Sequence, residues 1–565
     1  MEERKLNAAQ QEAAMHFTGP ALTLAGPGSG KTTVLTERTL NLVRRTRTPE
    51  QILSVTFTNA AGDEMRKRYR KASGACIEEL QTEAEPVFQT VHSYCNGLIR
   101  EYERNSAVRY ERIDEKTGGK MEILRKLYAE INGEEADPYL LNRIGNSRSG
   151  SPDPEIKNWR KIRKCYDAYK RQRRLIDFDD MIDLASEILH SDSCDKKRIR
   201  EQNQERFRFL QVDEAQDLTK EQFDILQIIA ASRNIFVVAD DDQSIYGFRG
   251  ASPVCVRVFY QSHPDCKLYR LSRNYRSAHK LVRVSAAFIS KNSDRFDKTL
   301  YSEKEEEGTL RIKACGNSIL QASFLRKEIR DLRRKEDGLT VGILYRNNIS
   351  GLLPRALFTK ENMPYTLMGE KTEIDSLPFL DGILSAIRMR ERESRWILPP
   401  PAETLRRLLE EGLEHRFESY CRDTRQHMRY KDAVLSFVFY LCDVCGSWKE
   451  AVRLLDRLDA AANNTNEGSI CFTTVHSAKG LEYDAVFIID AILGEFPGCG
   501  AAEGKLLEEE RRLFYVAMTR ARKYLYITYP LRRGNLYADR RPEKESIFLS
   551  EIKACMQAAA EEALT

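Results

Sequence analysis

The chain has 565 residues, 31% of them charged, and its formal net charge is +5 at pH 7. This length exceeds what a single hydrophobic core supports, so we expect several domains. The mean hydropathy of −0.53, together with the lack of an apolar run as long as a membrane span, predicts a protein with no membrane partner. The small net charge excludes a polycation that binds acidic partners over its whole surface.

Thirteen cysteines are scattered along the chain, and the first residues lack the apolar segment of a signal peptide. An odd, scattered set of cysteines does not indicate a disulfide framework, so we expect a cytoplasmic location of the bacterial type. Cys442 and Cys445 have no second cysteine pair and no nearby histidine, which favours two helix cysteines over a zinc site.

In chain order, a helix over 6–13 and a buried strand over 21–24 come first, followed by the loop Ala25-Gly26-Pro27-Gly28-Ser29-Gly30-Lys31-Thr32. A strand, a glycine-rich loop and Gly-Lys-Thr at a helix start form a phosphate-binding loop. Its backbone N–H groups surround a phosphate chain, and the helix N-terminus adds partial positive charge. We expect Lys31 to reach the β- and γ-phosphates and the Thr32 hydroxyl to ligate Mg²⁺.

Two β-rich runs follow, over 52–59 and 87–94, with a helix between them. Strands that alternate with helices predict a parallel α/β sheet. From about 97 to 175 the sequence is helical, charged and rich in tyrosine, which indicates a helical insertion. Basic residues crowd one stretch of it, 160–174, and fit a phosphate-binding surface and a solvated helix equally well.

The α/β pattern resumes with an apolar strand over 207–212 that ends in Asp213 and Glu214. Two acids at the end of a strand are unfavourable without a counter-ion, and Mg²⁺ occupies this place in phosphate-loop enzymes. We expect Asp213 to hold the ion through its water shell. Glu214 is predicted to orient and deprotonate the attacking water.

Another buried strand, 235–239, leads into the segment 240–250. A second α/β region begins near 280, with strands over 310–313 and 341–345, and a second helical insertion covers about 385–465. Strands over 469–475, 485–489 and 524–528 complete the pattern. The sequence therefore predicts two α/β domains, each interrupted by a helical insertion, without an internal sequence repeat.

Taken together, these motifs resemble the UvrD/Rep/PcrA family of superfamily 1 DNA helicases over almost the whole chain. The segments that carry the resemblance are Leu6-Asn7-x-x-Gln10, the phosphate loop, Thr56-Phe57-Thr58-Asn59, Thr90-Val91-His92-Ser93, Leu175-Ile176-Asp177-Phe178-Asp179-Asp180, Val212-Asp213-Glu214-Ala215-Gln216-Asp217, Val475-His476-Ser477-Ala478-Lys479-Gly480-Leu481-Glu482 and Phe514-Tyr515-Val516-Ala517-Met518-Thr519-Arg520-Ala521. Their order and spacing are far more specific than any single motif.

The resemblance implies two RecA-like parallel-sheet motor domains of the phosphate-loop NTPase class. Residues 1–96 and 175–278 are expected to form the first, ATP-binding domain, with 97–174 as its insertion. Residues 279–384 and 466–565 are expected to form the second domain. Its insertion, 385–465, is much reduced for the family.

The resemblance also implies ATP and Mg²⁺ as cofactors, with ATP in a cleft between the two domains. The expected catalytic residues are Lys31, Glu214, the γ-phosphate sensor Gln243, and the arginine fingers Arg276 and Arg520. Thr32 and Asp213 are the expected Mg²⁺ ligands. The ATP-binding set adds Gln10 and Tyr275 at the adenine, Glu482 from the second domain, and the loop residues Ala25, Gly26, Pro27, Gly28, Ser29, Gly30 and Thr33. Thr33 stands where the family often has arginine.

For DNA, the family places a single strand across both motor domains. The residues that match its contacts are Phe57, Thr58, His92, Tyr246, Phe248, Arg249, Thr474 and His476. Phe57, Tyr246 and Phe248 are candidates for base stacking, which grips without reading sequence. Core packing is the alternative for each aromatic ring. Phe248 occupies a position where tryptophan is common in the family.

The expected function is ATP-dependent movement 3′→5′ on single-stranded DNA, with unwinding of duplex DNA at single-strand/double-strand junctions. The polarity comes from the resemblance alone. The alternative is a DNA-stimulated motor or sensor subunit of a DNA-repair or phage-defence complex that needs a partner such as a nuclease. A DNA-independent phosphoryl transferase and an ATP-gated binding protein without movement are less favoured, because the hydrolysis residues and DNA motifs occur together.

Overall fold

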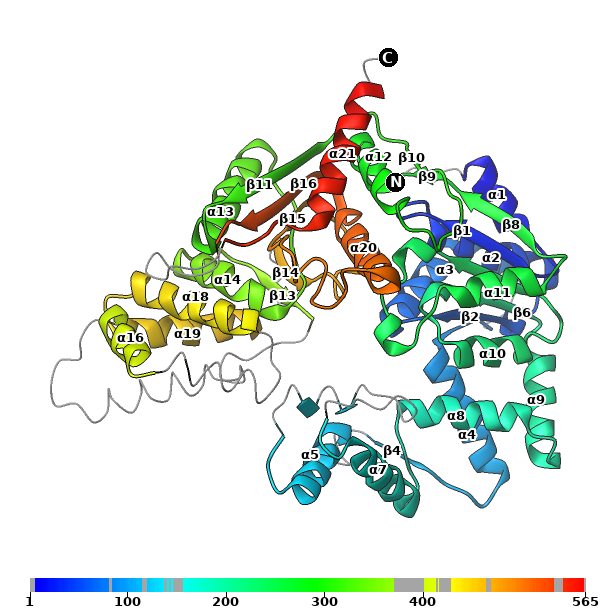
Figure 1. The fold of residues 1–565 in the computed structure, drawn as a ribbon. Helices are drawn as coiled ribbons and strands as arrows, with labels where there is room; N and C mark the ends of the chain where they lie inside the picture. The colour runs from blue at the N-terminus through cyan, green and yellow to red at the C-terminus, as the bar shows by residue number, and fades with distance from the viewer. Residues whose placement is uncertain are drawn as a thin grey trace. The chain divides into compact units, whose positions relative to one another are not determined.

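The computed structural model describes residues 6–80, 84–113, 119–136, 140–141, 144–145, 156–369, 401–412, 415, 428–463, 469–532 and 542–562. The chain divides into two compact units, Met1–Ser272 and Arg273–Thr565 (Figure 1). Each unit is built around its own parallel sheet. The finer division into two domains with two insertions stays a prediction.

The first unit contains a six-stranded parallel sheet in the order β3-β2-β6-β7-β1-β8. Its strands are β1 (Ala21–Ala25), β2 (Ile52–Thr56), β3 (Val87–Thr90), β6 (Phe209–Val212), β7 (Ile235–Ala239) and β8 (Lys267–Leu271). The four central strands are buried along their whole length. Such continuous burial is typical of parallel sheets that helices cover on both faces.

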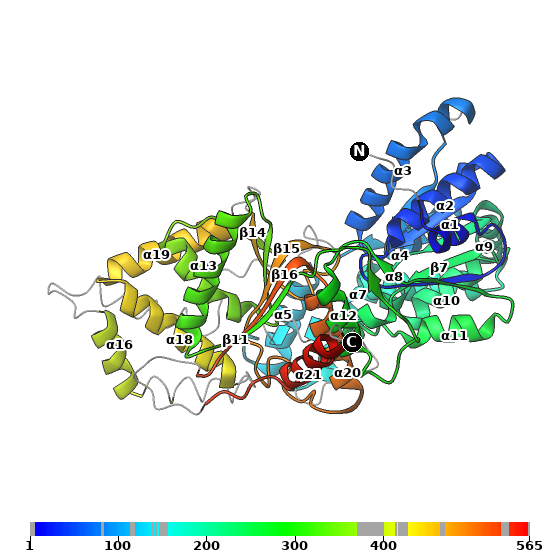
Figure 2. The ribbon, with the colours of Figure 1, turned by 90° about the horizontal axis from the view of Figure 1, so that it is seen from above.

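Helices lie on both faces of this sheet (Figure 2). The helices of this part of the first unit are α1 (Ala8–Met15), α2 (Lys31–Thr46), α3 (Asn59–Leu80), α4 (Val91–Asn105), α8 (Phe178–His190), α9 (Cys194–Arg206), α10 (Lys220–Ile229) and α11 (Val254–Ser262). The hydroxyl of Thr90 accepts a hydrogen bond from the Ser93 N–H at 3.2 Å and caps α4. A threonine N-cap ends the strand and starts the helix.

A smaller body within the first unit has its own apolar core around Leu124, Ile162 and Tyr166. Its helices include α5 (Gly119–Asn132) and α7 (Trp159–Arg173). The chain leaves and re-enters through β4 (Glu111–Arg112) and β5 (Leu175–Ile176), which pair in parallel. Residues 146–155 of the predicted insertion lie outside the described residues.

The second unit contains a six-stranded parallel sheet in the order β11-β16-β15-β12-β14-β13. Its strands are β11 (Thr309–Cys315), β12 (Val341–Tyr345), β13 (Thr366–Met368), β14 (Ile470–Thr474), β15 (Tyr483–Ile488) and β16 (Ala521–Pro530), and its helices include α12 (His279–Ile289), α13 (Ser318–Lys335), α14 (Leu352–Lys360), α20 (Gly504–Met518) and α21 (Ile547–Glu562). A short parallel pair, β9 (Arg273–Asn274) with β10 (Tyr301–Ser302), begins the unit.

Three helices, α16 (Pro401–Glu410), α18 (Met428–Val444) and α19 (Trp448–Asn463), share a core with α13, α14 and the sheet of this unit. They fall in the region predicted as the second helical insertion. The start of that insertion at 385, and Pro399-Pro400, lie outside the described residues.

Most predicted strands are confirmed, and the differences include the following two. The run 87–94 is a strand only to Thr90, because the cap of α4 makes Val91–Tyr94 helical. The edge strand β8 was not predicted, because Lys267 and Arg270 interrupt its apolar pattern where one side of the strand faces no neighbour. In the part of the chain that the structure describes, no helix is long and apolar enough to cross a membrane. Cys442 and Cys445, at the end of α18, are buried free thiols.

Candidate functional site

The carboxyl ends of three neighbouring strands, β6, β7 and β1, carry the residues predicted to hydrolyse ATP. The phosphate loop follows β1, Asp213 and Glu214 follow β6, and the segment 240–243 follows β7. Parallel strands end at one edge of a sheet, so segments far apart in sequence meet there. The edge lies wholly within the first unit.

Two glycines of the phosphate loop, Gly28 and Gly30, have φ values of 66° and 85°. Both lie in the left-handed region, which residues with a Cβ rarely adopt. At Gly30 a Cβ would also come within 2.6 Å of the Gln10 amide nitrogen. The loop therefore needs glycine at position 30 for both conformation and space.

Gln10 supports the loop from α1. Its amide nitrogen donates to the Ser29 carbonyl at 2.8 Å, and its amide oxygen accepts from the Asn7 N–H at 3.0 Å. The Ser29 hydroxyl donates to the Gly26 carbonyl at 2.8 Å, within the loop. In this state the amide of Gln10 thus holds the phosphate loop, and its predicted contact with adenine stays a prediction.

Lys31 and Glu214 form an ion pair, with 2.9 Å between Nζ and Oε1. Burial acts to lower the pKa of Lys31, but the carboxylates of Glu214, Asp240 and Asp213 outweigh it and the pKa is raised. Burial, followed by the charge of Glu214, raises the pKa of Asp213 to about 7. Glu214 has a φ of 51°, and its side chain accepts a hydrogen bond from Gln216. The predicted phosphate ligand and the predicted base are therefore in direct contact.

Gln243 lies at the same edge, where its amide nitrogen donates to Asp240 at 2.6 Å. Asp240 is itself held by its backbone N–H, which donates to the Gln216 side chain at 2.9 Å. Gln216 therefore contacts Glu214 with one amide atom and the Asp240 backbone with the other. These contacts couple the ends of β6 and β7, and they fix the side chain predicted to sense the γ-phosphate.

The side chains at this edge offer oxygen donors suited to a hard divalent cation. Thr32, at the start of α2, offers a hydroxyl, and Asp213 offers a buried carboxylate. The carboxylate oxygens of Asp240, Asp241 and Asp242 also lie within 4.8 Å of one another. Mg²⁺ prefers oxygen ligands of this kind, so the residues present fit the predicted ion.

Four of the predicted DNA-binding residues, Phe57, Tyr246, Phe248 and Arg249, form one cluster, which we call the aromatic cluster. The rings of Phe57 and Tyr246 are stacked, with centroids 5.0 Å apart and planes at 21°. Arg249 lies over both Tyr246 and Phe248, 5.5 Å from each centroid. Phe248 is 57% exposed, so its ring does not pack in the protein core, which was the alternative to base stacking.

His92 lies on α4 and packs edge-on against Phe178, the first residue of α8, with ring centroids 5.4 Å apart. Burial lowers the pKa of His92, against the opposing charge of Asp179. Phe178 is 66% exposed and was not predicted to bind DNA. The signal available in the sequence was an aromatic residue at a helix start between aspartates, where a core residue is unexpected.

The tetrapeptide Thr-Val-His-Ser occurs twice, at 90–93 and at 474–477. In both copies the threonine ends a strand, donates to the serine hydroxyl and accepts from the serine N–H. The distance between the threonine and serine hydroxyl oxygens is 2.9 Å in the first copy and 3.1 Å in the second. His476 is the counterpart in the second unit of His92 in the first.

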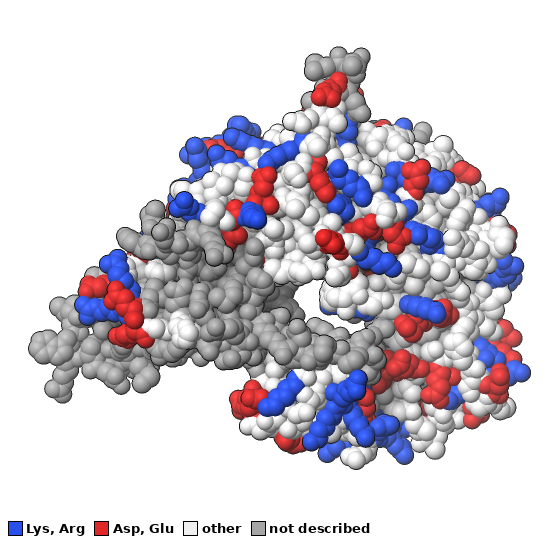
Figure 3. Space-filling view, viewed as in Figure 1, with Lys and Arg blue, Asp and Glu red and all other residues white. Residues whose placement is uncertain are grey.

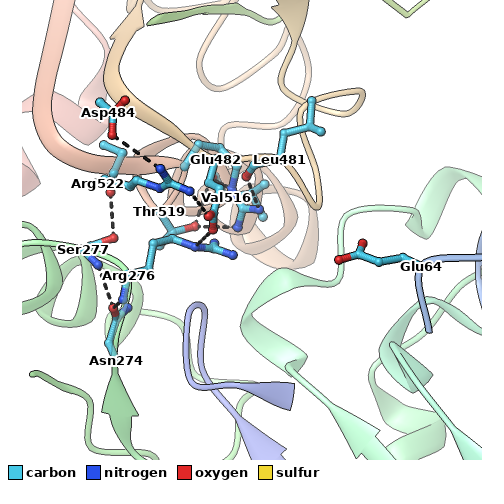
Figure 4. Close-up of polar contacts among 12 residues, drawn as sticks. Glu64, Asn274, Arg276, Ser277, Leu481, Glu482, Asp484, Val516, Thr519 and Arg522 are labelled. Atoms are coloured by element: carbon cyan, nitrogen blue, oxygen red, sulfur yellow. Dashed lines mark hydrogen bonds and ion pairs between the residues drawn. The ribbon is translucent and has the colours of Figure 1, made fainter. Parts of the chain in front are cut away.

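In the second unit, Arg276 and Glu482 form an ion pair, and Arg522 binds the same carboxylate (Figure 4). Arg522 also approaches Asp484, with 3.5 Å between Nη1 and Oδ1. Burial acts to raise the pKa of Glu482, but Arg276 and then Arg522 outweigh it and the pKa is lowered. Arg522 was not among the predicted site residues. Glu482 precedes β15 and Arg522 is the second residue of β16, so this cluster lies at the amino edge of its sheet.

Arg520 is only 2% exposed, and its guanidinium donates to groups of its own unit. Its Nε donates to the Val516 carbonyl at 2.9 Å, its Nη1 to the Leu481 carbonyl at 3.2 Å and its Nη2 to the Thr519 hydroxyl at 3.0 Å. Tyr275 is half-buried beside Arg276. The predicted contacts of Arg520 and Tyr275 with ATP stay predictions.

Some of the basic side chains of the stretch 160–174 are buried and the others are exposed. Lys170 is buried, with Nζ 3.1 Å from Asp177 and 2.7 Å from Asp180. Arg163 is also buried. The exposed basic residues are Arg160, Lys161, Lys164, Arg171, Arg173 and Arg174, and we call the first four of them the basic face of α7. Figure 3 shows Lys and Arg side chains close together over this part of the first unit. The predicted surface is thus smaller than the sequence stretch.

Family comparisons cover most of the chain. The model described as the UvrD/REP helicase N-terminal domain matches residues 6–264, and the model described as the UvrD-like helicase C-terminal domain matches 269–374 and 450–532. The chain is 27% identical to the putative ATP-dependent DNA helicase YjcD of Bacillus subtilis, over 95% of this chain and 80% of that protein. It is 27% identical to the ATP-dependent DNA helicase PcrA of Staphylococcus aureus and 28% identical to that of Staphylococcus epidermidis, in both cases over 97% of this chain and 86% of the relative.

Proposed function

The chain belongs to the UvrD/REP helicase family of ATP-dependent DNA helicases, and on this premise we propose that it moves 3′→5′ on single-stranded DNA and unwinds duplex DNA at junctions. The direction of movement, the residue roles, Mg²⁺ as the metal and a cytoplasmic location belong to this proposal. The observation that carries ATP hydrolysis is the ion pair of Lys31 with Glu214 beside the phosphate loop, and the direction of movement rests on the family resemblance alone.

We propose that ATP binding divides this ion pair. The γ-phosphate takes Lys31 as its ligand, which frees the Glu214 carboxylate to accept a proton from the attacking water. Glu214 is then the base, and Gln243, fixed by Asp240, contacts the γ-phosphate. Thr32 and Asp213 would hold Mg²⁺, which would supply positive charge to neutralise the phosphates.

Arg276 and Arg520 are proposed to stabilise the charge that develops on the γ-phosphate, with Tyr275 stacked on the adenine. Arginine fingers of this kind are typically worth ~10³–10⁵ in rate. Arg520 is buried, with its guanidinium bound to its own unit, so its engagement requires these hydrogen bonds to be exchanged for phosphate contacts. Nucleotide-dependent engagement of this kind couples hydrolysis to movement.

We propose that single-stranded DNA binds the aromatic cluster, Thr58 and His92 in the first unit, and Thr474 and His476 in the second. The exposed ring of Phe248 and the stacked pair beneath it support base stacking, which tolerates any sequence. The two Thr-Val-His-Ser turns support equivalent contacts with the DNA backbone in the two motor units.

The deciding experiment measures ATP hydrolysis with and without single-stranded DNA, followed by separation of a duplex with a 3′ single-stranded tail. We expect DNA to stimulate hydrolysis and the isolated chain to separate the strands. Stimulation without strand separation would instead favour the motor or sensor subunit that works with a partner such as a nuclease. An ATP hydrolysis rate that does not change when single-stranded DNA is added would contradict the proposal.

Replacing Phe248 by Ala should weaken single-strand binding by ~1–3 kcal/mol, the usual worth of one stacked base. Because the ring is 57% exposed, the melting temperature and the basal ATPase rate should change little. A buried phenylalanine would instead cost ~3–5 kcal/mol of stability. The measurement pairs melting temperature with single-strand affinity on the same protein.

Leu320→Ala is the matched control for Phe248→Ala, because Leu320 is an exposed apolar residue of the second unit, on α13. It should leave both quantities unchanged. The defect of Phe248→Ala should be similar on mixed and homopolymer strands. A large fall in melting temperature with unchanged affinity would show that Phe248 supports the fold and does not bind DNA.

Replacing the four residues of the basic face of α7 by Gln should weaken binding to a duplex junction. Each lost phosphate contact should make the slope of log affinity against log salt less steep by about 0.9. Arg125→Gln with Lys126→Gln is the control, because both residues pair with Glu122 on α5. Unchanged slopes in the fourfold variant would show that this face is only solvated.

A further inference from the structure

Arg522 contacts the Arg276–Glu482 pair through both its backbone and its side chain. Its carbonyl oxygen accepts a hydrogen bond from the Ala278 N–H at 2.8 Å, two residues beyond Arg276. Its guanidinium binds one oxygen of the Glu482 carboxylate, and Arg276 binds the other oxygen. These contacts close a ring from Arg276 along the backbone to Ala278, then to Arg522, to Glu482 and back to Arg276. Figure 4 shows the part of this ring formed by Arg276, Glu482 and Arg522.

The segment that carries Arg276 is fixed to β16 by further hydrogen bonds. The Ser277 hydroxyl donates to the Ala521 carbonyl at 2.7 Å. The Asn274 side chain accepts from the N–H groups of Arg276 and Ser277 at 2.8 and 2.9 Å. The backbone of Arg276 is therefore held in place, and the direction of its long side chain depends on the ion pair with Glu482.

Asp484 offers Arg522 a second carboxylate, which Thr340 holds in place. Its carboxylate accepts from the Thr340 N–H at 3.0 Å and from the Thr340 hydroxyl at 2.6 Å, and Arg522 lies 3.5 Å away. Arg522 thus links Glu482 to a carboxylate that is fixed on the backbone just before β12. A planar guanidinium can join two carboxylates in this way, whereas an ammonium group acts as a single point charge.

The ion pair with Glu482 uses the Nε of Arg276. Among the described residues, its two terminal nitrogens have no hydrogen-bond partner, and together they form the fork that binds a phosphate in a bidentate manner. Without Arg522, the Glu482 carboxylate loses its second ligand and can rotate. The guanidinium of Arg276 then loses its fixed direction.

We propose that Arg522 is a positioning residue for ATP hydrolysis, which fixes Glu482 and so holds the guanidinium of Arg276 in the orientation that meets the γ-phosphate. This inference rests on the proposed function, in which Arg276 contacts that phosphate. In this scheme Arg522 contacts neither ATP nor the attacking water, and it acts only through Glu482 and Arg276.

The test is a double-mutant cycle of Arg522→Gln and Arg276→Ala, measured as DNA-stimulated ATP hydrolysis at saturating single-stranded DNA. Misplacement of a catalytic group by about 1 Å can cost ~10²-fold, so we expect Arg522→Gln to lower kcat at least 10-fold. KM for ATP should change much less, because the phosphate loop is untouched. In the Arg276→Ala background, Arg522→Gln should cause no further loss of kcat.

Arg522→Lys keeps the charge without the fork and should give an intermediate kcat. Arg311→Gln is the control for a lost charge, since Arg311 is an exposed arginine on β11 of the same unit, 3.9 Å from Glu328. Melting temperatures of all variants should match the wild-type value. If Arg522→Gln melts early, Arg522→Lys takes its place in the cycle.

The possible results distinguish a failure of the positioning role of Arg522 from a failure of the proposed role of Arg276. Unchanged kcat in Arg522→Gln, or a full further loss in the Arg276→Ala background, overturns the positioning role while the role of Arg276 stands. A wild-type kcat in Arg276→Ala overturns the role of Arg276 itself, and the inference with it. Loss of kcat in both single variants without further loss in the double variant supports the inference.

Discussion

Lys31→Ala is expected to abolish ATP turnover while the protein stays folded. Lys31 lies at the first position of α2, where its Nζ meets Glu214 at 2.9 Å and the charges of Asp240 and Asp213 raise its pKa. It is therefore the cation that faces the acidic carboxyl edge of the sheet. Removing one group that stabilises transition-state charge costs on the order of 10²–10³-fold in kcat. Removing this one also takes away a ligand of the ATP phosphates.

The measurement for Lys31→Ala is the ATPase rate at saturating single-stranded DNA, with DNA affinity in the absence of nucleotide as a test of folding. The aromatic cluster does not contain Lys31, so nucleotide-free DNA binding should remain. Lys197→Ala is the matched control, because this lysine lies on α9 in the same unit, exposed and 3.9 Å from Glu201. Hydrolysis at the wild-type rate in Lys31→Ala would refute the phosphate-loop assignment.

The phosphate loop was predictable because its chemistry is local. The conformations of Gly28 and Gly30, the lysine and the helix start follow one another within a few residues. The same holds for Asp213 and Glu214, which end an apolar strand. The parallel sheet then brings these two local signals to one edge, which follows from the alternation of strands and helices.

The role of Arg522 was not predictable in this way, because its partners lie far away in sequence. Glu482 is 40 residues before Arg522 and Asp484 is 38 residues before it. The three residues meet only because β15 pairs with β16, in a register that sets Tyr483 beside Ala521. The apolar pattern of a strand indicates which of its faces is buried, but it does not identify which other strand it pairs with or which charged residues at the strand ends will meet.

The basic stretch of α7 shows a second feature that could not be predicted from the sequence, namely which of its basic residues are buried. Arg163 and Lys170 look like surface residues in the sequence, but both point inward, and Lys170 neutralises Asp177 and Asp180 where the chain returns to the sheet. Buried charges of this kind need partners, and those partners follow the helix in the chain. Helical periodicity alone does not tell which basic residues are internal.

The two units also differ in where their candidate residues lie. In the first unit, the nucleotide residues and the aromatic cluster follow the carboxyl ends of strands. In the second unit, His476 follows the carboxyl end of β14, whereas Glu482 and Arg522 lie at the amino ends of β15 and β16. The predicted DNA and nucleotide residues of the second unit therefore occupy opposite edges of its sheet.

Glu214→Gln should keep ATP binding and single-strand binding but lose hydrolysis. Gln has the shape of Glu and can keep the contact with Gln216, but it cannot accept the proton of the attacking water. General base catalysis is worth ~10²–10⁴-fold, so kcat should fall by that factor. The loss of the ion pair with Lys31 leaves the lysine free for phosphate, so ATP affinity should be equal to or higher than in the wild type.

The measurement for Glu214→Gln is a nucleotide-binding titration beside a single-turnover hydrolysis assay, each with and without single-stranded DNA. Glu205→Gln, an exposed carboxylate on α9 of the same unit, is the matched control and should behave as the wild type. Because ATP stays bound without being cleaved, the variant should also stay in the ATP-bound state on DNA. If Glu214→Gln failed to bind ATP, the ion pair with Lys31 would be a structural support of the loop, and the base would lie elsewhere. A strand-separation defect with normal hydrolysis would likewise contradict the role of Glu214, because the base acts before movement in this scheme.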